Sequence, residues 1–263
     1  MFILYRPEVG DDPDEIAALK ESGIPYSRFR TEIPENSLVV GRYSVLPYYS
    51  EVEGDVKNRN SEFANSETQH RFLADILQVA PFLEGLTPPA YSTWIDLPED
   101  SYFLKGKTNS RKTNWETHCF AKTAKDVPTI ARRLLDDTFI RDQGIVVRPY
   151  IPLETFDVGI NGMPVTNEWR FFFWGNQEVA HGYYWANFEE FADQAVLDPE
   201  GIALAQKVAN KVAAAGKAKF FVVDVAKTQK GNWICIELND GQMSGLCCID
   251  PTEFYQSLKR IVS

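Results

Sequence analysis

Three oxygen-bearing side chains near the C-terminal end of the sequence could bind a metal ion. Glu237 and Asn239 lie two positions apart in an apolar run, 233–239, so a strand would point both toward one face. A second apolar run, 220–225, carries Asp224 and would pair with the first run as a β-hairpin. Carboxylate and carboxamide oxygens suit Mg²⁺, which usually takes one or two carboxylates together with substrate phosphates. The pattern indicates a magnesium site shared by two strands.

A purely structural interpretation of the same stretch competes with the metal site. Residues 239–241, Asn-Asp-Gly, are also a strong turn signal, so the segment could simply be a buried strand that ends in a turn. In either case Ile236 and Leu238 are expected to face the core, opposite the proposed ligands. The choice between the two interpretations depends on the rest of the chain.

Lys105 could contact phosphate groups. It lies near the end of a predicted strand, 102–107, and a polar segment, 108–114, follows. A lysine at the end of a buried strand can be held against a phosphate, and the neighbouring loop can offer backbone N–H groups to further phosphate oxygens. The G-x-x-x-x-G-K-[ST] spacing of a Walker motif is absent, and lysines also mark ordinary sheet edges. By itself, the segment does not distinguish a phosphate site from a sheet edge.

Residues 144–154 combine a buried strand with a proline-restricted extended segment. The prolines would leave backbone N–H and C=O groups unpaired, so that these groups could bind an adenine ring. Arg148 lies in the apolar part, where its burial is costly unless an anion or a carboxylate pairs with it. The segment is a candidate adenine site with a cation beside it.

Glu168 and Arg170 are two further charged candidates, in the aromatic run 168–174. Because they are two residues apart on a predicted strand, they share one face of the sheet. An internal ion pair between them is the structural interpretation, and a role in binding a substrate is the functional one. The run 178–184 is expected to be the paired strand.

The composition is that of a soluble globular protein with a large core. The 263 residues are 44% hydrophobic and carry a formal net charge of −10, with an isoelectric point near 4.9. This acidity argues against a nucleic-acid partner. No run approaches 18 apolar residues and the N-terminal apolar stretch is too short for a signal peptide, so we expect no membrane partner and a cytoplasmic location. The four cysteines fit neither a disulfide framework nor a zinc site.

The N-terminal part begins as an α/β unit. A strand at 2–6 precedes a helix that starts near the acidic residues 12–15, and helical spacing of apolar residues predicts another helix over 68–79. The stretch 42–66 is polar and irregular, which predicts a surface loop. Its candidates for substrate contact are Arg42, Tyr43, Tyr48, Tyr49 and Arg59, although an ordinary exposed loop is the simpler interpretation.

The order of these motifs resembles the ATP-grasp superfamily. It is similar in particular to the clade, common in bacteria and phages, that is marked by two arginines and a lysine in the nucleotide site. The resemblance rests on Lys105, the 148–154 segment, the 168–170 strand, Asp224 and the 237–239 strand, in that order. It covers about residues 86–263 well and the first 85 residues more loosely.

The resemblance implies an α+β fold. Residues 1–85 would form an α/β N-terminal domain and residues 86–263 an ATP-grasp domain, with the nucleotide held between two α+β subdomains. The first subdomain, about 86–150, would be a small lid, and the second, 151–263, would carry the metal site. Adjacent prolines and a new run of strands near residue 88 mark the boundary between the domains.

The resemblance also implies which residues bind the nucleotide. Lys105 would contact the α- and β-phosphates. Arg148, which stands where many family members have a second lysine, would lie beside an adenine segment that includes Tyr150 and Ile151. Either Glu154 or Asp157 would bind the ribose hydroxyls.

Further residues are implied at the reacting end of the nucleotide. Arg170 would stabilise the transferred γ-phosphoryl group, with Glu168 orienting it. Asp224, Glu237 and Asn239 would hold Mg²⁺ on the β- and γ-phosphates. The cofactors are thus ATP and Mg²⁺.

The implied activity is that of an ATP-dependent ligase. A substrate carboxylate would attack the γ-phosphate to give an acyl phosphate, from which an amine or similar nucleophile would displace phosphate. Lys105, Arg148 and Arg170 would supply the positive charge that lets two anions react. A mobile cover would exclude water from the acyl phosphate, and Arg111 and Lys112 in the 108–114 segment are its candidates.

Two other functions are compatible with the same residues. A phosphotransferase would place the γ-phosphate on a hydroxyl or amine and stop there, and a non-catalytic protein would only bind the nucleotide. All three metal positions carry polar side chains, which argues against a degenerate site. The sequence leaves the substrate as a small molecule or a peptide, selected by the N-terminal domain. Dimers are common in the implied fold, so a homodimer is compatible with it.

Overall fold

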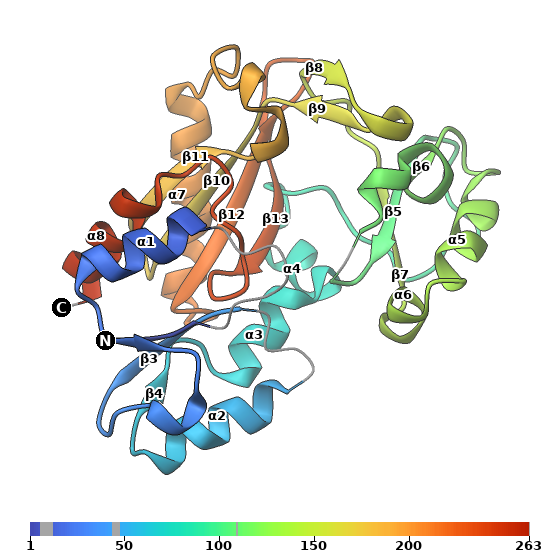
Figure 1. Ribbon diagram of the computed structural model, residues 1–263. Coiled ribbons are helices and arrows are strands. Elements are labelled where there is room, and N and C mark those ends of the chain that lie inside the picture. The colour runs from blue at the N-terminus through green and yellow to red at the C-terminus, as the bar shows by residue number, and fades with distance from the viewer. Residues whose placement is uncertain (6–12, 44–47, 109, 263) are drawn as a thin grey trace.

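The computed structural model describes residues 1–5, 13–43, 48–108 and 110–262. Figure 1 shows a central sheet, a smaller lobe (green) to one side of it, and the N-terminal residues (blue) below it. The central sheet and the N-terminal sheet have four strands each, and the sheet of the small lobe has three. Among the described residues, helices long and apolar enough to cross a membrane are absent.

The N-terminal residues form a parallel sheet, which agrees with the predicted α/β unit. Its strand order is β2-β1-β3-β4, and the central pair buries Ile3, Leu4, Val39 and Val40 completely. The elements are β1 (Phe2–Tyr5), α1 (Pro13–Ser22), β2 (Tyr26–Ser27), η1 (Arg30–Glu32), β3 (Leu38–Arg42), α2 (Tyr49–Asn58) and β4 (Glu62–Phe63).

The prediction of an irregular surface loop over 42–66 is wrong for most of its length, although residues 44–47 lie outside the described part. α2 and β4 occupy it because Tyr49, Val52 and Val56 repeat at helical spacing and are all buried. Arg42 is also buried, where its guanidinium pairs with Glu15. Arg42 and Tyr49 therefore serve the core of the N-terminal region rather than an exposed loop.

The helix predicted over 68–79 is present but divided in two. α3 (Glu67–Ala74) begins at a capping box formed by Ser66 and Gln69, and α4 (Ile76–Phe82) begins after Asp75. The Asp75 side chain accepts a hydrogen bond from the N–H of Leu77 at 3.0 Å and so caps the second helix. Both helices lie within the proposed 1–85 domain, yet they pack against the central sheet.

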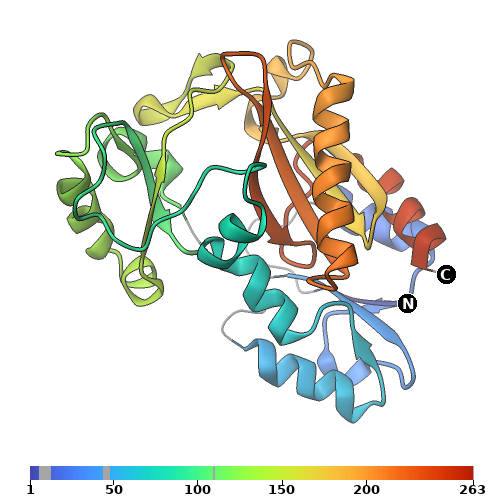
Figure 2. The same ribbon diagram turned by 180° about the vertical axis from the view of Figure 1, so that it is seen from behind.

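The central sheet is antiparallel, in the order β11-β10-β12-β13. Its strands are β10 (Glu168–Trp174), β11 (Gln177–Tyr183), β12 (Phe220–Lys227) and β13 (Trp233–Asp240), of which the last two form the predicted hairpin. Successive side chains of β10 and β12 alternate between two faces. One face packs on helix α7 (Pro199–Ala214), which lies along the sheet in Figure 2, and the other on α8 (Pro251–Val262) and α1.

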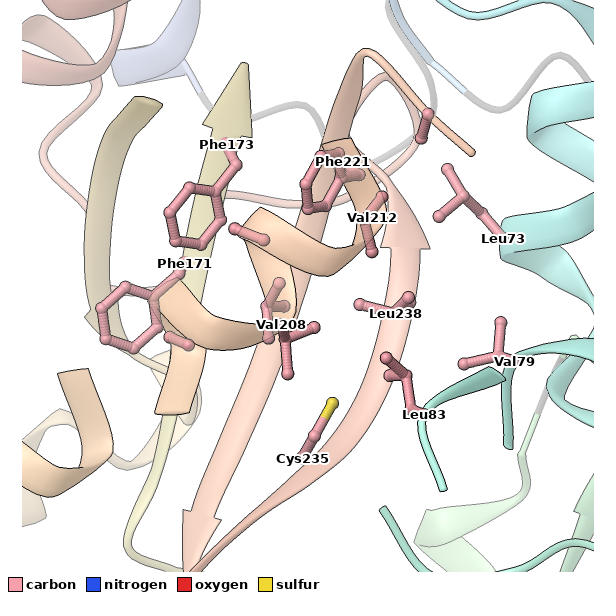
Figure 3. Packing of buried hydrophobic residues seen from close by; sticks show 14 of the residues in the cluster. Leu73, Val79, Leu83, Phe171, Phe173, Val208, Val212, Phe221, Cys235 and Leu238 are labelled. Atoms are coloured by element: carbon pink, nitrogen blue, oxygen red, sulfur yellow. The ribbon is translucent and has the colours of Figure 1, made fainter. Parts of the chain in front are cut away.

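The core on the α7 face combines residues from distant parts of the sequence. Figure 3 shows Phe171, Phe173 and Phe221 of the sheet around Val208 and Val212 of α7. Leu73 and Val79 approach the same cluster from α3 and α4. The even-numbered positions of β10 point to the opposite face, so Arg170 and Glu168 lie on the side of the sheet that α8 covers farther along the strand.

A β-bulge in β13 changes the expected orientation of one residue. Glu237 lies opposite Asp224, but Cys235 rather than Ile236 lies opposite Val225. Ile236 is therefore the extra residue of the bulge. Leu238 and Cys235 enter the core, whereas Ile236 is only partly buried and lines a cavity on the other side. The expectation that Ile236 faces the core is wrong because simple alternation does not continue through a bulge.

The small lobe is the lid-like region that the sequence predicts. Its sheet has the order β6-β5-β7 and is built from β5 (Tyr102–Gly106), β6 (Phe120–Ala121) and β7 (Ile145–Pro149). Helices α5 (Val127–Leu135) and α6 (Thr138–Gln143) complete the lobe, and short helical segments cover 112–114 and 115–119. A hairpin of β8 (Thr155–Val158) and β9 (Pro164–Thr166), with a turn at 160–162, connects the lobe to the central sheet (Figure 1). The remaining short helical segment covers 186–191.

Candidate active site

Arg170 and Asp224 form a buried ion pair on the central sheet. They lie opposite each other in the β10–β12 register, and both Nε–Oδ1 and Nη2–Oδ2 are 2.9 Å apart. Burial by itself would lower the pKa of Arg170, but the Asp224 carboxylate raises that pKa well above its ordinary value. The expectation that Glu168 orients Arg170 is therefore wrong: Asp224 does so, because the register places it directly across from the guanidinium.

Lys105 and Glu237 form a second ion pair beside the first. The ammonium group reaches the Glu237 carboxylate from the end of β5, so this pair joins the lid lobe to the central sheet. Although burial favours the protonated acid, the charge of Lys105 lowers the pKa of Glu237 to about 2. Each predicted carboxylate ligand thus faces a cation from another strand.

The three predicted metal ligands lie together. Asp224 and Glu237 are cross-strand neighbours, and Asn239 Nδ2 lies 3.3 Å from Asp224 Oδ2. Two carboxylates and a carboxamide are hard oxygen donors, which fit Mg²⁺. Within the described ranges, no group of three or more His, Cys, Asp or Glu side chains is placed to hold a metal. An ion here would therefore depend on Asn239 and on phosphate oxygens as well as on the two acids.

Arg148 is buried without the carboxylate partner that the sequence suggested. Its Nη1 donates to the carbonyl oxygen of Ile236 at 2.9 Å, and its Nη2 donates to Thr87 Oγ1 and the Pro88 carbonyl at 2.7 and 2.8 Å. Burial lowers its pKa. Its Nε is buried and has no hydrogen-bond partner among the described residues. Neutral oxygens hold Arg148 in place, so its charge is left to attract an anion.

An apolar cavity lies between the lid lobe, the connecting hairpin and β13. Arg148, Glu168 and Lys112 supply its charged lining. Its other lining residues are Pro88, Phe103, Trp115, Pro149, Tyr150, Ile151, Leu153, Pro164, Thr166, Trp185, Ile234 and Ile236. A flat apolar slot with cations at its edge suits a nucleobase joined to phosphates.

The backbone of the adenine segment is only partly available. The N–H of Tyr150 donates to the carbonyl of Ser101 at 2.9 Å, so the expected free backbone group is already paired at this residue. Its aromatic ring remains in the cavity wall, edge-on to Phe120. For Ile151, which also lines the cavity, no backbone partner is found within the described ranges. Ile151 is therefore the residue whose backbone could bind a base.

Neither candidate for the ribose lines the cavity. The Glu154 carboxylate accepts a hydrogen bond from Asn167 Nδ2 at 2.7 Å, and Asp157 is exposed on β8. Both lie in or next to the hairpin that borders the cavity. The assignment of the ribose to one of them stays a prediction.

Lys112 has a central position that the sequence did not assign to it. Predicted as part of a cover, it lines the same cavity as Glu168, and its Nζ lies 4.8 Å from the centre of the Tyr184 ring. Burial would lower the pKa of Lys112, but Glu168 and other carboxylates raise it. Burial raises the pKa of Glu168, whose Oε1 is without a hydrogen-bond partner in the described part of the chain. By contrast, Arg111 pairs with Asp137 in the lid lobe.

The comparison with protein families decides the identity of this arrangement. The family model for an ATP-grasp domain, the third family of the clade with two arginines and a lysine, matches residues 96–258. The chain belongs to the ATP-grasp family. The prediction that it is an ATP-grasp enzyme, with the α+β fold of that family, is confirmed. No curated protein matches this ATP-grasp chain.

Solved structures share the ATP-grasp fold over nearly the whole chain. D-cycloserine synthetase DcsG has a TM-score of 0.60 at 14% identity, covering 100% of this chain and 99% of its own. A RimK domain ATP-grasp protein from Sphaerobacter thermophilus DSM 20745 has a TM-score of 0.57 at 10% identity, with 98% of each chain covered. Macrocyclase MdnC from Microcystis aeruginosa MRC, bound with precursor peptide MdnA, has a TM-score of 0.57 at 13% identity, with 99% of each covered.

Proposed function

We propose that this ATP-grasp protein is a ligase that uses ATP to activate a carboxylate as an acyl phosphate, which an amine then attacks. One observation carries the proposal: the cations Lys105, Lys112 and Arg170 and the acids Asp224 and Glu237 meet at the end of an apolar cavity. The cavity suits the nucleobase, and the charged end suits a polyphosphate with its counter-ions.

The acids at the charged end have the donor chemistry for the metal that accompanies ATP. Asp224, Glu237 and Asn239 would hold Mg²⁺, which when bound neutralises charge on the β- and γ-phosphates. When phosphates arrive, Lys105 can exchange its contact with Glu237 for a phosphate oxygen, which frees Glu237 as a ligand. The ion pairs therefore keep each charged group compensated before the nucleotide binds.

The cations at this end would allow two anions to react. A carboxylate that approaches the γ-phosphate meets strong repulsion, which Arg170 and Lys112 would reduce. Arg170 is held by two bonds to Asp224 and a third to the carbonyl of Gly245, so its orientation is fixed before the substrates bind. Fixed charges avoid the reorganisation that water would need, and this lowers the barrier to in-line transfer.

The segment after β5 would shelter the acyl phosphate from water. Lys112 and Trp115 from this segment line the apolar cavity. Asn161, in the turn of the connecting hairpin, donates to the carbonyl of Thr113 at 2.7 Å and ties the segment to the far side. Exclusion of water matters because an acyl phosphate hydrolyses readily.

A hydroxylamine trap tests the proposal directly. The protein is incubated with ATP, Mg²⁺ and hydroxylamine in the presence of single carboxylates, and the hydroxamate is measured by mass spectrometry together with ADP. The carboxylates should include amino acids and peptides with acidic side chains, because the proteins of similar fold include an amino-acid-analogue synthetase and a macrocyclase bound with a peptide. We expect one class of carboxylate to give hydroxamate and ADP in equal amounts.

The same experiment separates the ligase from the other functions. A phosphotransferase would give ADP and a stable phosphorylated product without hydroxamate, and a binding protein would give neither. Arg170→Lys is the matched variant, because it keeps the positive charge but loses the two-bond contact with Asp224. It should reduce hydroxamate formation by at least about tenfold.

A further inference from the structure

His70 is a buried histidine with one unsatisfied ring nitrogen. It lies on α3, only 3% of the residue is exposed, and its ring stacks on Tyr49 with 4.6 Å between the ring centres. Its Nδ1 is 3.1 Å from Asp240 Oδ2. Its Nε2 is buried and has no hydrogen-bond partner in the part of the chain that the structure describes.

The surroundings of Asp240 determine which nitrogen of His70 carries the proton. The other carboxylate oxygen, Oδ1, accepts from Asn65 Nδ2 at 2.8 Å and from the backbone N–H of Gln242 at 3.0 Å. A carboxylate surrounded by donors is ionised and can only accept. His70 Nδ1 therefore donates to Asp240, and the neutral ring carries its free electron pair on Nε2.

His70 also lines the space next to the predicted metal ligands. One cavity is bounded by His70, Glu237, Asn239 and Lys107. A second cavity, toward the N-terminal helices, shares His70 and Lys107 with the first and is bounded as well by Asp75. Neither cavity includes residues of the apolar slot, so both are available to a substrate other than the nucleotide.

We propose that His70 is the general base for the amine in the second half of the ligase reaction, which rests on the function proposed above. The amine nitrogen attacks the acyl carbon, a C–N bond forms, and the bond from the acyl carbon to the phosphate oxygen breaks so that phosphate leaves with the electron pair. The proton that the nitrogen must lose passes to His70 Nε2 and from there to the released phosphate or to solvent. Asp240 is a positioning residue that stabilises the imidazolium formed in this step.

A second histidine of the chain offers a matched comparison. His181 also contacts a carboxylate through Nδ1, at 2.7 Å from Glu178 Oε1, but this pair is exposed on β11. His181 lines neither cavity. If a carboxylate neighbour were all that mattered, the two histidines would behave alike.

The first test is spectroscopic and needs no substrate. Long-range ¹H–¹⁵N correlation spectra of the histidine rings at neutral pH, assigned with His70→Gln and His181→Gln, report which nitrogen is protonated. We expect a single Nδ1–H form for His70, which Asp240→Asn disrupts, and an averaged signal for His181. A proton on Nε2 of His70 would overturn the proposal, because that nitrogen could then not accept one.

The second test asks whether His70 acts on the amine rather than on the fold. Variants are given ATP, Mg²⁺ and the carboxylate that forms hydroxamate with the wild type, and either hydroxylamine or glycinamide as the nucleophile. Hydroxylamine reacts with acyl phosphates unaided, so the ratio of amide to hydroxamate should fall about a hundredfold in His70→Gln and stay constant in His181→Gln. An unchanged ratio in His70→Gln sinks the proposal, whereas absence of hydroxamate in the wild type would instead refute the ligase function.

Discussion

Arg170 and Asp224 face each other across β10 and β12 through two parallel hydrogen bonds, Nε–Oδ1 and Nη2–Oδ2, both 2.9 Å long. Only 9% of the Arg170 side chain and 1% of the Asp224 side chain are exposed. The pair therefore connects the reacting end of the site to the stability of the central sheet, and the same two groups should influence both.

Asp224→Asn should destabilise the protein strongly. The variant leaves the Arg170 charge buried without its carboxylate, and loss of one partner of a buried pair costs about 3–5 kcal/mol of unfolding free energy. Urea unfolding followed by circular dichroism measures the difference. Arg71→Ala is the control, because Arg71 and Glu67 form an exposed pair on α3 that is worth about 0.5 kcal/mol. Equal losses in the two variants would show that the buried pair is not a strong contact.

ATP with Mg²⁺ should raise the melting temperature, and Glu237→Gln should reduce that rise. A ligand that binds only the folded state stabilises it by about 2.7 kcal/mol at a hundredfold excess over its dissociation constant. Glu237 is one of the acids that would bind the metal, so the effect requires Mg²⁺ and ATP together. Glu62→Gln is the control, since Glu62 forms an exposed ion pair with Lys219 far from the cavity. If neither ligand combination moves the wild-type transition, the nucleotide site is refuted.

The stabilising effect of Glu237 should depend on pH. Its pKa is lowered in the folded state from an ordinary value of 4.5 to about 2, so its contribution is complete above about pH 5 and is lost as the pH falls from 4.5 toward 2. The wild type should exceed Glu237→Gln in unfolding free energy at neutral pH, and this difference should shrink by about 3 kcal/mol on acidification. Chemical unfolding at a series of pH values provides the measurement, and a difference that stays constant with pH contradicts the ion pair with Lys105.

Lys112→Gln should weaken ATP binding by about tenfold or more. Lys112 lies in the cavity with Glu168, and its removal takes away a cation from the phosphate end and leaves that acid buried. Trp115 and Trp185 line the same cavity, so tryptophan fluorescence can follow the titration. Lys122→Gln is the matched control, because Lys122 is exposed beyond β6. Equal affinities of the two variants would place the phosphates away from Lys112.

The sequence predicts the strands of the site better than it predicts their register. The hairpin with Asp224, Glu237 and Asn239 follows from apolar runs and is present, as is the strand with Glu168 and Arg170. The partner of Arg170 could not be predicted, because pairing of β10 with β12 joins residues that are 54 positions apart. Periodicity within one strand carries no information about which residue lies opposite on another.

The missed features have similar physical reasons. Lys112 lies in a polar segment without a regular period, and only the fold of the lid lobe brings it beside Glu168. Alternation assigns Ile236 to the wrong face because a bulge adds a residue that a simple period cannot anticipate. In 42–66, the spacing of Val52 and Val56 is that of a buried helix face, but the surrounding polar residues hid this signal.

The packing of α1 against α8 affects how this chain can fold during its synthesis. Leu19 and Ala18 of the first helix share a core with Phe254 and Leu258 of the last, and both groups contact Phe172 of the sheet (Figure 1). Until residues 251–262 have left the ribosome, the apolar face of α1 lacks this partner. Such long-range contacts slow folding and leave apolar surface exposed meanwhile. We therefore expect nascent chains that end before α8 to need chaperones, although the lid lobe has its own core.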